Sequence, residues 1–167
     1  MQIEVLRAEP EQRQVLTNLA QLYQYDFSEI EKGGVVNDDG LFPYVNLEPY
    51  WREPDKHVCL ARVDGRWAGF ALVSKHSYLS NAHDTMEISE FFVMRKYRGQ
   101  GVGDAMARYI FDLFPGKWEL QVTHNNIRAL NFWVRVVGNY TGGKFTQVYL
   151  TKGWHGPVIS FDSSQLP

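Results

Sequence analysis

A glycine-rich turn between a strand and a helix is the sequence feature that most constrains the fold. Residues 86–94 alternate in the way of a β-strand, and residues 98–103 follow with the sequence Arg-Gly-Gln-Gly-Val-Gly. Apolar side chains then recur at helical spacing between residues 102 and 113. The sequence therefore predicts a strand, a tight turn and an amphipathic helix in direct succession.

Strand and helix patterns alternate along the rest of the chain, and their order indicates the fold class. Asp64 and Gly65 lie between two apolar runs and predict a tight antiparallel hairpin. Residues 26–55 are rich in glycine, proline and aromatic side chains and are expected to be irregular. These patterns predict the α+β (mixed α/β) class and a single domain over residues 1–167. The other expected elements are strands at residues 3–5, 58–63, 67–73, 118–123, 144–150 and 157–161 and helices at residues 16–23 and 126–137.

Composition and charge exclude several classes of protein. The 167 residues are 44% hydrophobic with a formal charge of -2, which argues against disorder and against binding nucleic acid through its phosphates. The single cysteine, Cys59, lies in an apolar run, so we expect it in the core and expect neither disulfides nor a metal site. No stretch approaches the roughly 20 apolar residues that cross a bilayer, and the first residues lack a signal-peptide pattern. We therefore expect no membrane partner and a cytoplasmic location, and a homodimer is compatible with the sequence.

The glycine turn is suited to holding a diphosphate. The start of a helix exposes unpaired backbone N–H groups and the positive end of the helix dipole, and glycines leave room for an anion beside them. The two common phosphate motifs do not match. No Lys-Ser or Lys-Thr follows the glycines, and Asp104 or Met106 stands where the dinucleotide fingerprint needs a third glycine. The alternative is that the glycines only permit a tight turn and close helix packing.

Two segments of the chain resemble the acetyl-CoA-binding core of the GNAT superfamily of N-acetyltransferases. The first is residues 90–103, Glu-Phe-Phe-Val-Met-Arg-Lys-Tyr-Arg-Gly-Gln-Gly-Val-Gly, and the second is residues 126–133, Asn-Ile-Arg-Ala-Leu-Asn-Phe-Trp. The resemblance covers residues 86–138 and implies a central, mixed, largely antiparallel sheet flanked by helices. It also implies transfer of an acetyl group from acetyl-CoA to a primary amine by direct attack in a ternary complex.

The resemblance further implies a role for individual residues. Arg98 would open the turn whose backbone amides hold the cofactor diphosphate, and the strand residues Val93 and Met94 would pair with the pantetheine arm. The Val93 N–H would face the thioester carbonyl during catalysis, and Asn126 would bond the pantetheine or a water beside it. Trp133 belongs to the same cofactor-binding region. The turn residues concerned are Gly99, Gln100, Gly101, Val102 and Gly103.

Acetyl transfer to an amine needs a base, because an alkylammonium with a pKa of about 10 has no free lone pair. Glu87 is the first candidate, since it lies on the strand that leads to the thioester site, where several family members keep a carboxylate. Alternation places Glu87, Ser89 and Val93 on one face of this strand and Glu90, the second candidate, on the other. Glu119 on the next strand is the third. For each, the alternative is a structural carboxylate that is exposed or ion-paired.

The acid that would protonate the departing thiolate is less defined. Many family members have a tyrosine where this chain has Trp133, and an indole N–H is too weak an acid. Tyr140 and His124 are the alternatives, together with departure of an unprotonated thiolate, which is a fair leaving group.

The acceptor is an amine that the sequence does not identify. The acidic and aromatic segment 26–55 suits a cationic acceptor, or else it forms a solvated loop over an aromatic plug. Two other functions remain open. One is a non-catalytic acyl-CoA-binding module, favoured by the tryptophan at residue 133, and the other is a structural domain whose glycines only pack.

Overall fold

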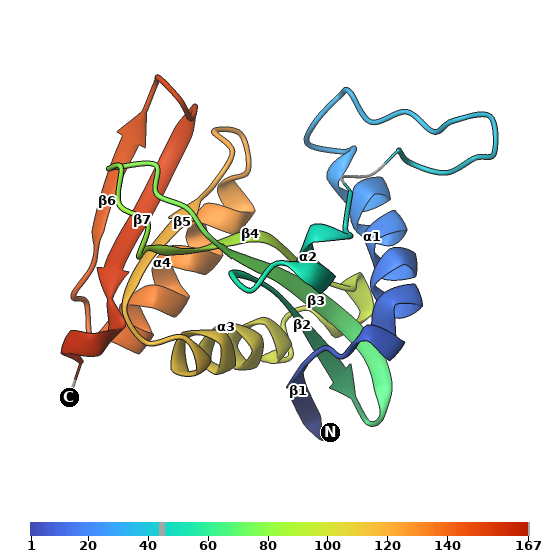
Figure 1. The fold of residues 1–167 in the computed structure, drawn as a ribbon, viewed down its shortest axis with the longest axis horizontal. Helices are drawn as coiled ribbons and strands as arrows, with labels where there is room; N and C mark the ends of the chain where they lie inside the picture. Colours follow the sequence, from blue (N-terminus) through green and yellow to red (C-terminus); the bar gives the residue numbers. More distant parts are fainter. Residues whose placement is uncertain (44–45, 167) are drawn as a thin grey trace.

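The computed structural model describes residues 1–43 and 46–166, which form a mixed sheet covered by helices (Figure 1). The strands are β1 (Ile3–Arg7), β2 (Lys56–Val63), β3 (Arg66–Lys75), β4 (Met86–Val93), β5 (Lys117–Gln121), β6 (Thr146–Leu150) and β7 (Gly156–Asp162). The α-helices are α1 (Arg13–Phe27), α2 (Pro49–Arg52), α3 (Val102–Leu113) and α4 (Ile127–Thr141), with 3₁₀ turns at Pro10–Gln12, Arg95–Tyr97 and Ser163–Gln165. Across the sheet the order is β1-β2-β3-β4-β5-β7-β6, and of the described neighbours only β4 and β5 run parallel. This is the mixed, largely antiparallel fold class that the sequence predicts.

Several predicted boundaries differ from the observed ones at the ends of elements, where local patterns are least informative. Helices α1 and α4 are each longer than predicted, and Gly142 in a left-handed conformation ends α4. Strand β5 is shorter and ends at Gln121. The segment 26–55, expected to be irregular throughout, contains the last residues of α1 and the short helix α2. Tyr44 and Val45 of this segment lie outside the described residues.

Side chains on the two faces of the sheet form two hydrophobic cores. On one face α3 and α4 pack over a core that includes Phe111, Trp118 and Trp133. On the other face α1 packs over a smaller core that includes Leu16, with α2 at its margin, and Figure 1 shows α1 and α3 on opposite sides of the sheet. Cys59 is fully buried in the first core, as predicted, and burial raises the pKa of its thiol to about 12. The thiol is therefore protonated at neutral pH and does not act as a nucleophile.

A β-bulge in β4 reverses the alternation that the sequence predicts for this strand. The register against β3 slips by one residue between Ile88 and Glu90, which leaves Ser89 as the extra residue. Ile88 and Val93 consequently pack in the same core, although an odd spacing would put them on opposite faces. Glu87 and Glu90 therefore share the face of α1 and α2. The prediction that they lie on opposite faces was wrong, because strict alternation holds only for a regular strand.

The sheet opens between its two parallel strands. Strands β4 and β5 pair over only Met86–Glu87 and Trp118–Glu119, whereas β5 pairs along its whole length with β7 on its other edge. The edge of β4 between residues 89 and 93 therefore has no described strand on the β5 side. None of the helices in residues 1–43 and 46–166 has the length and apolar character that a membrane span requires.

Candidate active site

A cleft of about 850 Å³ lies along the open edge of β4, between the end of α1 and the start of α4. It brings together most of the residues that the sequence assigned to the cofactor. Those that line it are Val93, Arg98, Gly99, Gly101, Gly103, Asn126 and Trp133. Three predicted residues do not line it. Gln100 donates from Nε2 to the Lys96 carbonyl at 2.7 Å. Val102, the first residue of α3, is buried, and Met94 packs at the margin of both cores.

The glycine turn has the backbone that an anion site needs. Gly101 caps α3 with a φ of +83°, a left-handed conformation that favours glycine. A side chain at this residue would enter open space at the cleft. The next residues, Gly103 and Asp104, also line the cleft, so the first turn of α3 faces it. Unpaired N–H groups of that turn and the positive end of the α3 dipole therefore lie where an anion can reach them.

Gly103 serves a second purpose, which is close packing of α3 against α4. A Cβ atom at this residue would come within 2.9 Å of the Phe132 ring. The tight-packing alternative that the sequence left open therefore holds for Gly103, whereas Gly101 has open space around it.

Arg98 is held by the protein itself at the mouth of the cleft. Its Nε donates to the Val93 carbonyl at 2.8 Å, and its guanidinium forms an ion pair with Asp26 at the end of α1. Asp26 also pairs with Arg95 at 2.6 Å. Burial acts to raise the pKa of Asp26, but the bonds from Arg98 and Arg95 outweigh it and hold that pKa below its ordinary value. No local pattern predicts this pairing, because its two members are 72 residues apart in the chain.

We expect Asp26→Asn to lower the free energy of unfolding at pH 7 by no more than about 1 kcal/mol, because the ion pair is partly exposed and screened. The pKa of Asp26 is lower in the folded protein than its ordinary value of 3.8. The ion pair therefore stabilises the fold fully when the pH is above 3.8, and this stabilisation is lost as the pH falls through the pKa of Asp26 in the folded state. Urea unfolding at pH 7 and near pH 3 should therefore show a difference from the wild type that shrinks in acid. If Asp26→Asn and the wild type differed in unfolding free energy by the same amount at both pH values, the ion pair would be contradicted. Asp38→Asn, at an exposed position in a loop, is the control.

Backbone geometry directs one N–H group of β4 into the cleft. The Met94 N–H donates to the Ala68 carbonyl of β3 at 2.8 Å. Hydrogen-bonding groups alternate between the two sides of a strand, so the N–H and carbonyl of the preceding residue, Val93, point away from β3. This agrees with the bond that the Val93 carbonyl accepts from Arg98. The Val93 N–H therefore lies at the open side of β4, the side from which a ligand in the cleft can reach it.

Glu87 is buried in a polar cluster on the face of α1 and α2. Its Oε1 accepts hydrogen bonds from Ser74 Oγ at 2.7 Å and Ser89 Oγ at 3.0 Å. The Tyr78 hydroxyl lies close to the same carboxylate, and burial together with this charge raises the pKa of that hydroxyl. Glu87 Oε2 is buried and has no partner of normal hydrogen-bond geometry among residues 1–43 and 46–166. Two serine hydroxyls therefore hold one oxygen of this carboxylate, and the Tyr78 hydroxyl lies beside it.

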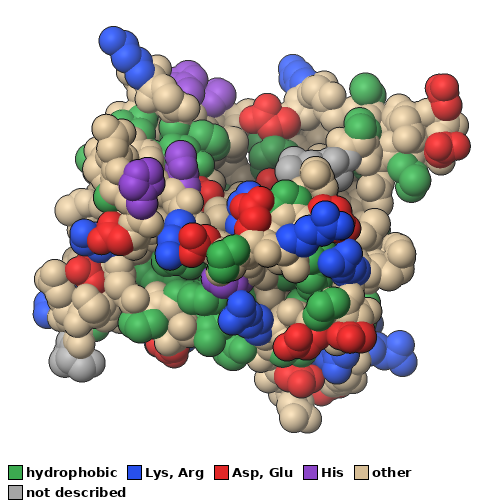
Figure 2. All heavy atoms as spheres, in the orientation of Figure 1, with side chains coloured by type: hydrophobic (Ala, Val, Ile, Leu, Met, Phe, Trp, Pro, Cys, Tyr) green, Lys and Arg blue, Asp and Glu red, His purple; other side chains and the backbone are tan. Residues whose placement is uncertain are grey.

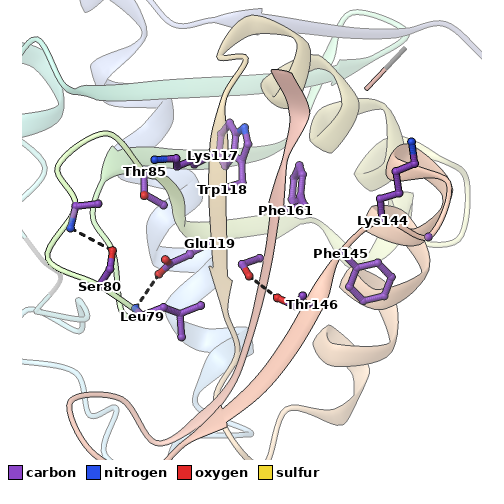
Figure 3. Close-up of a pocket in the computed structure, with 13 residues that line it drawn as sticks. Leu79, Ser80, Thr85, Lys117, Trp118, Glu119, Lys144, Phe145, Thr146 and Phe161 are labelled. Carbon is purple, nitrogen blue, oxygen red and sulfur yellow. Dashed lines mark hydrogen bonds between the residues drawn. The ribbon is translucent and has the colours of Figure 1, made fainter. Parts of the chain in front are cut away.

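The other two predicted carboxylates are already bound by the protein. Glu90 accepts a hydrogen bond from the hydroxyl of Tyr23, a cleft-lining residue that the sequence analysis did not identify. Glu119 Oε1 accepts from Ser77 Oγ at 2.7 Å, and its Oε2 accepts from the N–H groups of Tyr78 at 2.6 Å and Leu79 at 3.3 Å. Figure 3 shows Glu119 directed at the loop between β3 and β4, beside a second hollow of about 580 Å³. Glu119 therefore anchors this loop.

Neither predicted alternative for the acid lines the cleft. The Tyr140 hydroxyl donates to Asp112 at 2.7 Å, and burial first and then this carboxylate raise its pKa to about 12. His124 stacks on His155 with ring centroids 4.8 Å apart, and Figure 2 shows histidine side chains gathered over the β6–β7 hairpin and the β3–β4 loop. Trp133 does line the cleft, where its ring packs against the Phe91 ring with centroids 4.8 Å apart.

These features define a mixed α/β protein with an anion-binding turn at a helix start, beside the open edge of a strand. The model of the acetyltransferase (GNAT) family matches residues 17–138, and the chain belongs to this family. No curated protein matches the sequence.

Solved structures with the same fold are found among acetyltransferases. One is nourseothricin acetyltransferase, with 18% sequence identity and a TM-score of 0.60 over 98% of this chain and 99% of that chain. Another is PaiA N-acetyltransferase from Thermoplasma acidophilum in complex with coenzyme A, with 12% identity and a TM-score of 0.62 over 97% and 99%. A third is the ribosomal-protein-S18-alanine N-acetyltransferase from Escherichia coli, with 17% identity and a TM-score of 0.60 over 99% and 97%. At these identities the likeness shows the fold.

Proposed function

We propose that this protein transfers the acetyl group of acetyl-CoA to a primary amine by direct attack in a ternary complex. The observation that carries the proposal is the continuity of one cleft, in which the open edge of β4 leads at Val93 into the glycine turn of α3. An extended ligand with a diphosphate at one end and amide groups along its length suits this arrangement. Membership of the acetyltransferase family and the fold shared with a coenzyme A complex support it.

The residues that would hold acetyl-CoA are those of the cleft. Backbone N–H groups from Gly101 into the first turn of α3 would bind the diphosphate. The open edge of β4 would pair with the pantetheine amides as an added strand does. Asn126 Oδ1 accepts the Ala129 N–H at 3.1 Å as the cap of α4, so its Nδ2 group is the one that would donate to pantetheine.

The chemistry needs a proton acceptor and a donor to the developing oxyanion. Glu87 would take a proton from the acceptor ammonium through intervening water, because six residues of β4, about 20 Å, separate Glu87 from Val93. The free amine would then form a bond from nitrogen to the thioester carbon. The Val93 N–H would stabilise the negative oxygen until the carbon–sulfur bond breaks, when the thiolate leaves and the nitrogen passes its second proton to that thiolate. We prefer Glu87 to Glu119 as the base because both oxygens of Glu119 are used in anchoring a loop. A dedicated acid is not needed for a thiolate leaving group.

A thiol-release assay with acetyl-CoA and a panel of amines tests the proposal. We expect amine-dependent release, together with a stabilisation of about 2.7 kcal/mol when acetyl-CoA is present at about 100 times its dissociation constant. Stabilisation without thiol release would favour the second candidate, a non-catalytic acyl-CoA-binding module, for which Trp133 at the family's tyrosine position is the specific observation. Absence of both effects would contradict an acyl-CoA site of either kind.

A further inference from the structure

Three carboxylates line the cleft along β4, those of Asp26, Glu29 and Asp104. Each of them is paired with an arginine. Asp104 differs from the other two because it belongs to the first turn of α3, where the diphosphate would bind. Its partner is Arg135 of α4, which also lines the cleft. The ion pair between Asp104 and Arg135 therefore belongs to the same surface as the glycine turn.

The carboxylate of Asp104 lies beside the backbone donors that an anion would use. The Ala105 N–H donates to the Gly101 carbonyl at 2.9 Å, so the N–H groups that the helix leaves without an intrahelical partner precede Ala105. Asp104 supplies one of these groups, and its short side chain keeps the carboxylate close to them. This carboxylate is ionised at neutral pH, because the hydrogen bonds from Arg135 hold the pKa of Asp104 below its ordinary value. A negative charge therefore stands where the proposed function needs a second one to bind.

A carboxylate at this position has opposite effects on the helix and on the bound anion. It stabilises α3 in the absence of ligand, because it complements the positive end of the helix dipole. It opposes a diphosphate, because like charges a few ångström apart repel each other even in water. A diphosphate carries more than one negative charge, so an unpaired Asp104 would weaken its binding by about tenfold at low salt. The cofactor site therefore needs this charge to be offset.

Arg135 offsets the charge of Asp104 through a bidentate contact. Its Nη1 donates to Asp104 Oδ2 at 2.6 Å, and its Nη2 donates to Asp104 Oδ1 at 2.8 Å. The guanidinium also lies over the Phe132 ring, 5.6 Å from the ring centroid. Phe132 is the residue that packs against Gly103 of the turn. The guanidinium is thus held by Asp104 and by a ring that contacts the turn, and both oxygens of Asp104 are bonded to α4.

We propose that Arg135 is a positioning residue of the cofactor site. By pairing with Asp104 it cancels the charge of that carboxylate and holds it toward α4, so that the start of α3 can accept a diphosphate. The identity of this anion as the diphosphate of acetyl-CoA rests on the proposed function. Arg135 therefore sets the affinity for the cofactor through Asp104 and takes no part in the transfer of the acetyl group.

A double-mutant cycle on the ion pair tests this role. Arg135→Met keeps a side chain that can cover the Phe132 ring but leaves Asp104 unpaired, so the dissociation constant for coenzyme A should rise about tenfold at low salt. Arg135→Gln is a second, polar form of the same loss. Asp104→Asn combined with Arg135→Met restores the charge balance, and its dissociation constant should return to within about twofold of the wild-type value. Asp104→Asn alone leaves an unpaired cation and should bind coenzyme A more tightly. Isothermal titration calorimetry measures each constant.

Salt dependence and a matched control separate this role from a structural one. The ratio of the dissociation constants of Arg135→Met and the wild type should fall toward one as NaCl is raised from about 50 mM to about 500 mM, because salt screens the repulsion. Arg13→Met is the control. Arg13 also pairs with a carboxylate, that of Glu48 at 3.1 Å, and lies over the Trp51 ring at 5.5 Å, but it does not line the cleft. Its replacement should leave the dissociation constant for coenzyme A unchanged.

Three results would overturn the proposal. The first is an unchanged dissociation constant in Arg135→Met. The second is a double variant that binds as weakly as Arg135→Met, since the arginine would then contact the ligand directly. The third is a loss of affinity of equal size at low and high salt, which would indicate a structural role.

Coenzyme A binding requires no acceptor, so the cycle can be measured even if no amine is acetylated and the proposed function fails. If the wild type does not bind coenzyme A, inorganic diphosphate is the probe. The same order of dissociation constants among the four proteins would then support the role of Arg135, and no binding of inorganic diphosphate to the wild type would overturn it.

Discussion

Glu87→Gln is expected to lower kcat for amine acetylation by about 10²–10⁴-fold, the range of general-base catalysis. The substitution keeps an oxygen that can accept the bonds from Ser74 and Ser89, so the surrounding cluster can persist. It removes the group that takes the proton from the ammonium. The remaining activity should rise with pH as the free amine in solution becomes more abundant. Steady-state kinetics over a range of pH values measures both effects.

Two further substitutions on the same face are the comparison for this result. Glu119→Gln weakens the bonds that hold the loop at Ser77 and Tyr78, so it should act on the melting temperature and the KM for the amine more than on the pH profile. Affinity for acetyl-CoA in Glu87→Gln should equal that of the wild type, because Glu87 does not line the cofactor cleft. If Glu87→Gln kept the kcat of the wild type and Glu90→Gln had a much lower kcat, Glu90 would be the base instead.

The parts of the fold that the sequence predicts correctly are those set by local interactions. Asp64 and Gly65 both adopt a positive φ in a two-residue turn, which is the geometry that this dipeptide favours. The strand, turn and helix around Gly101 are also local, because each is defined within a few residues. For the same reason the residues near this turn that were assigned to the cofactor could be expected to lie together, and most of them line one cleft.

The face of the sheet on which Glu87 and Glu90 lie was harder to predict, because a single irregular residue decides it. Ser89 sits opposite no residue of β3, and nothing in its type distinguishes it from a regular strand residue. Without the bulge, Glu87 and Glu90 would lie on opposite faces, and Glu90 could not reach the Tyr23 hydroxyl of α1. Contacts between residues far apart in sequence, such as that of Asp26 with Arg98, have no local signal at all. The fold, not the residue pattern, determines them.

Gly101→Val should abolish the stabilisation of the protein by acetyl-CoA. Two effects act in the same direction. A β-branched residue is strained at the φ of +83°, so the turn would move, and the new side chain would occupy the space beside the first N–H groups of α3. The expected loss is the whole ligand-induced stabilisation, about 2.7 kcal/mol at 100 times the wild-type dissociation constant. Thermal or urea unfolding with and without acetyl-CoA measures it.

The control for this substitution must carry the same backbone strain at a different place. Gly142 meets this need, because it caps the end of α4 with a φ of +62°, has no atom within 4 Å of the position of a Cβ, and does not line the cofactor cleft. Gly142→Val should therefore cost stability in the absence of ligand, as Gly101→Val does, and keep the full stabilisation by acetyl-CoA. If Gly101→Val kept it as well, the diphosphate could not lie against the start of α3. If both variants lost the stabilisation, general destabilisation would explain the loss. Calorimetry on the folded variants would then decide, because a binding site at the turn requires Gly101→Val to bind acetyl-CoA more weakly than Gly142→Val does.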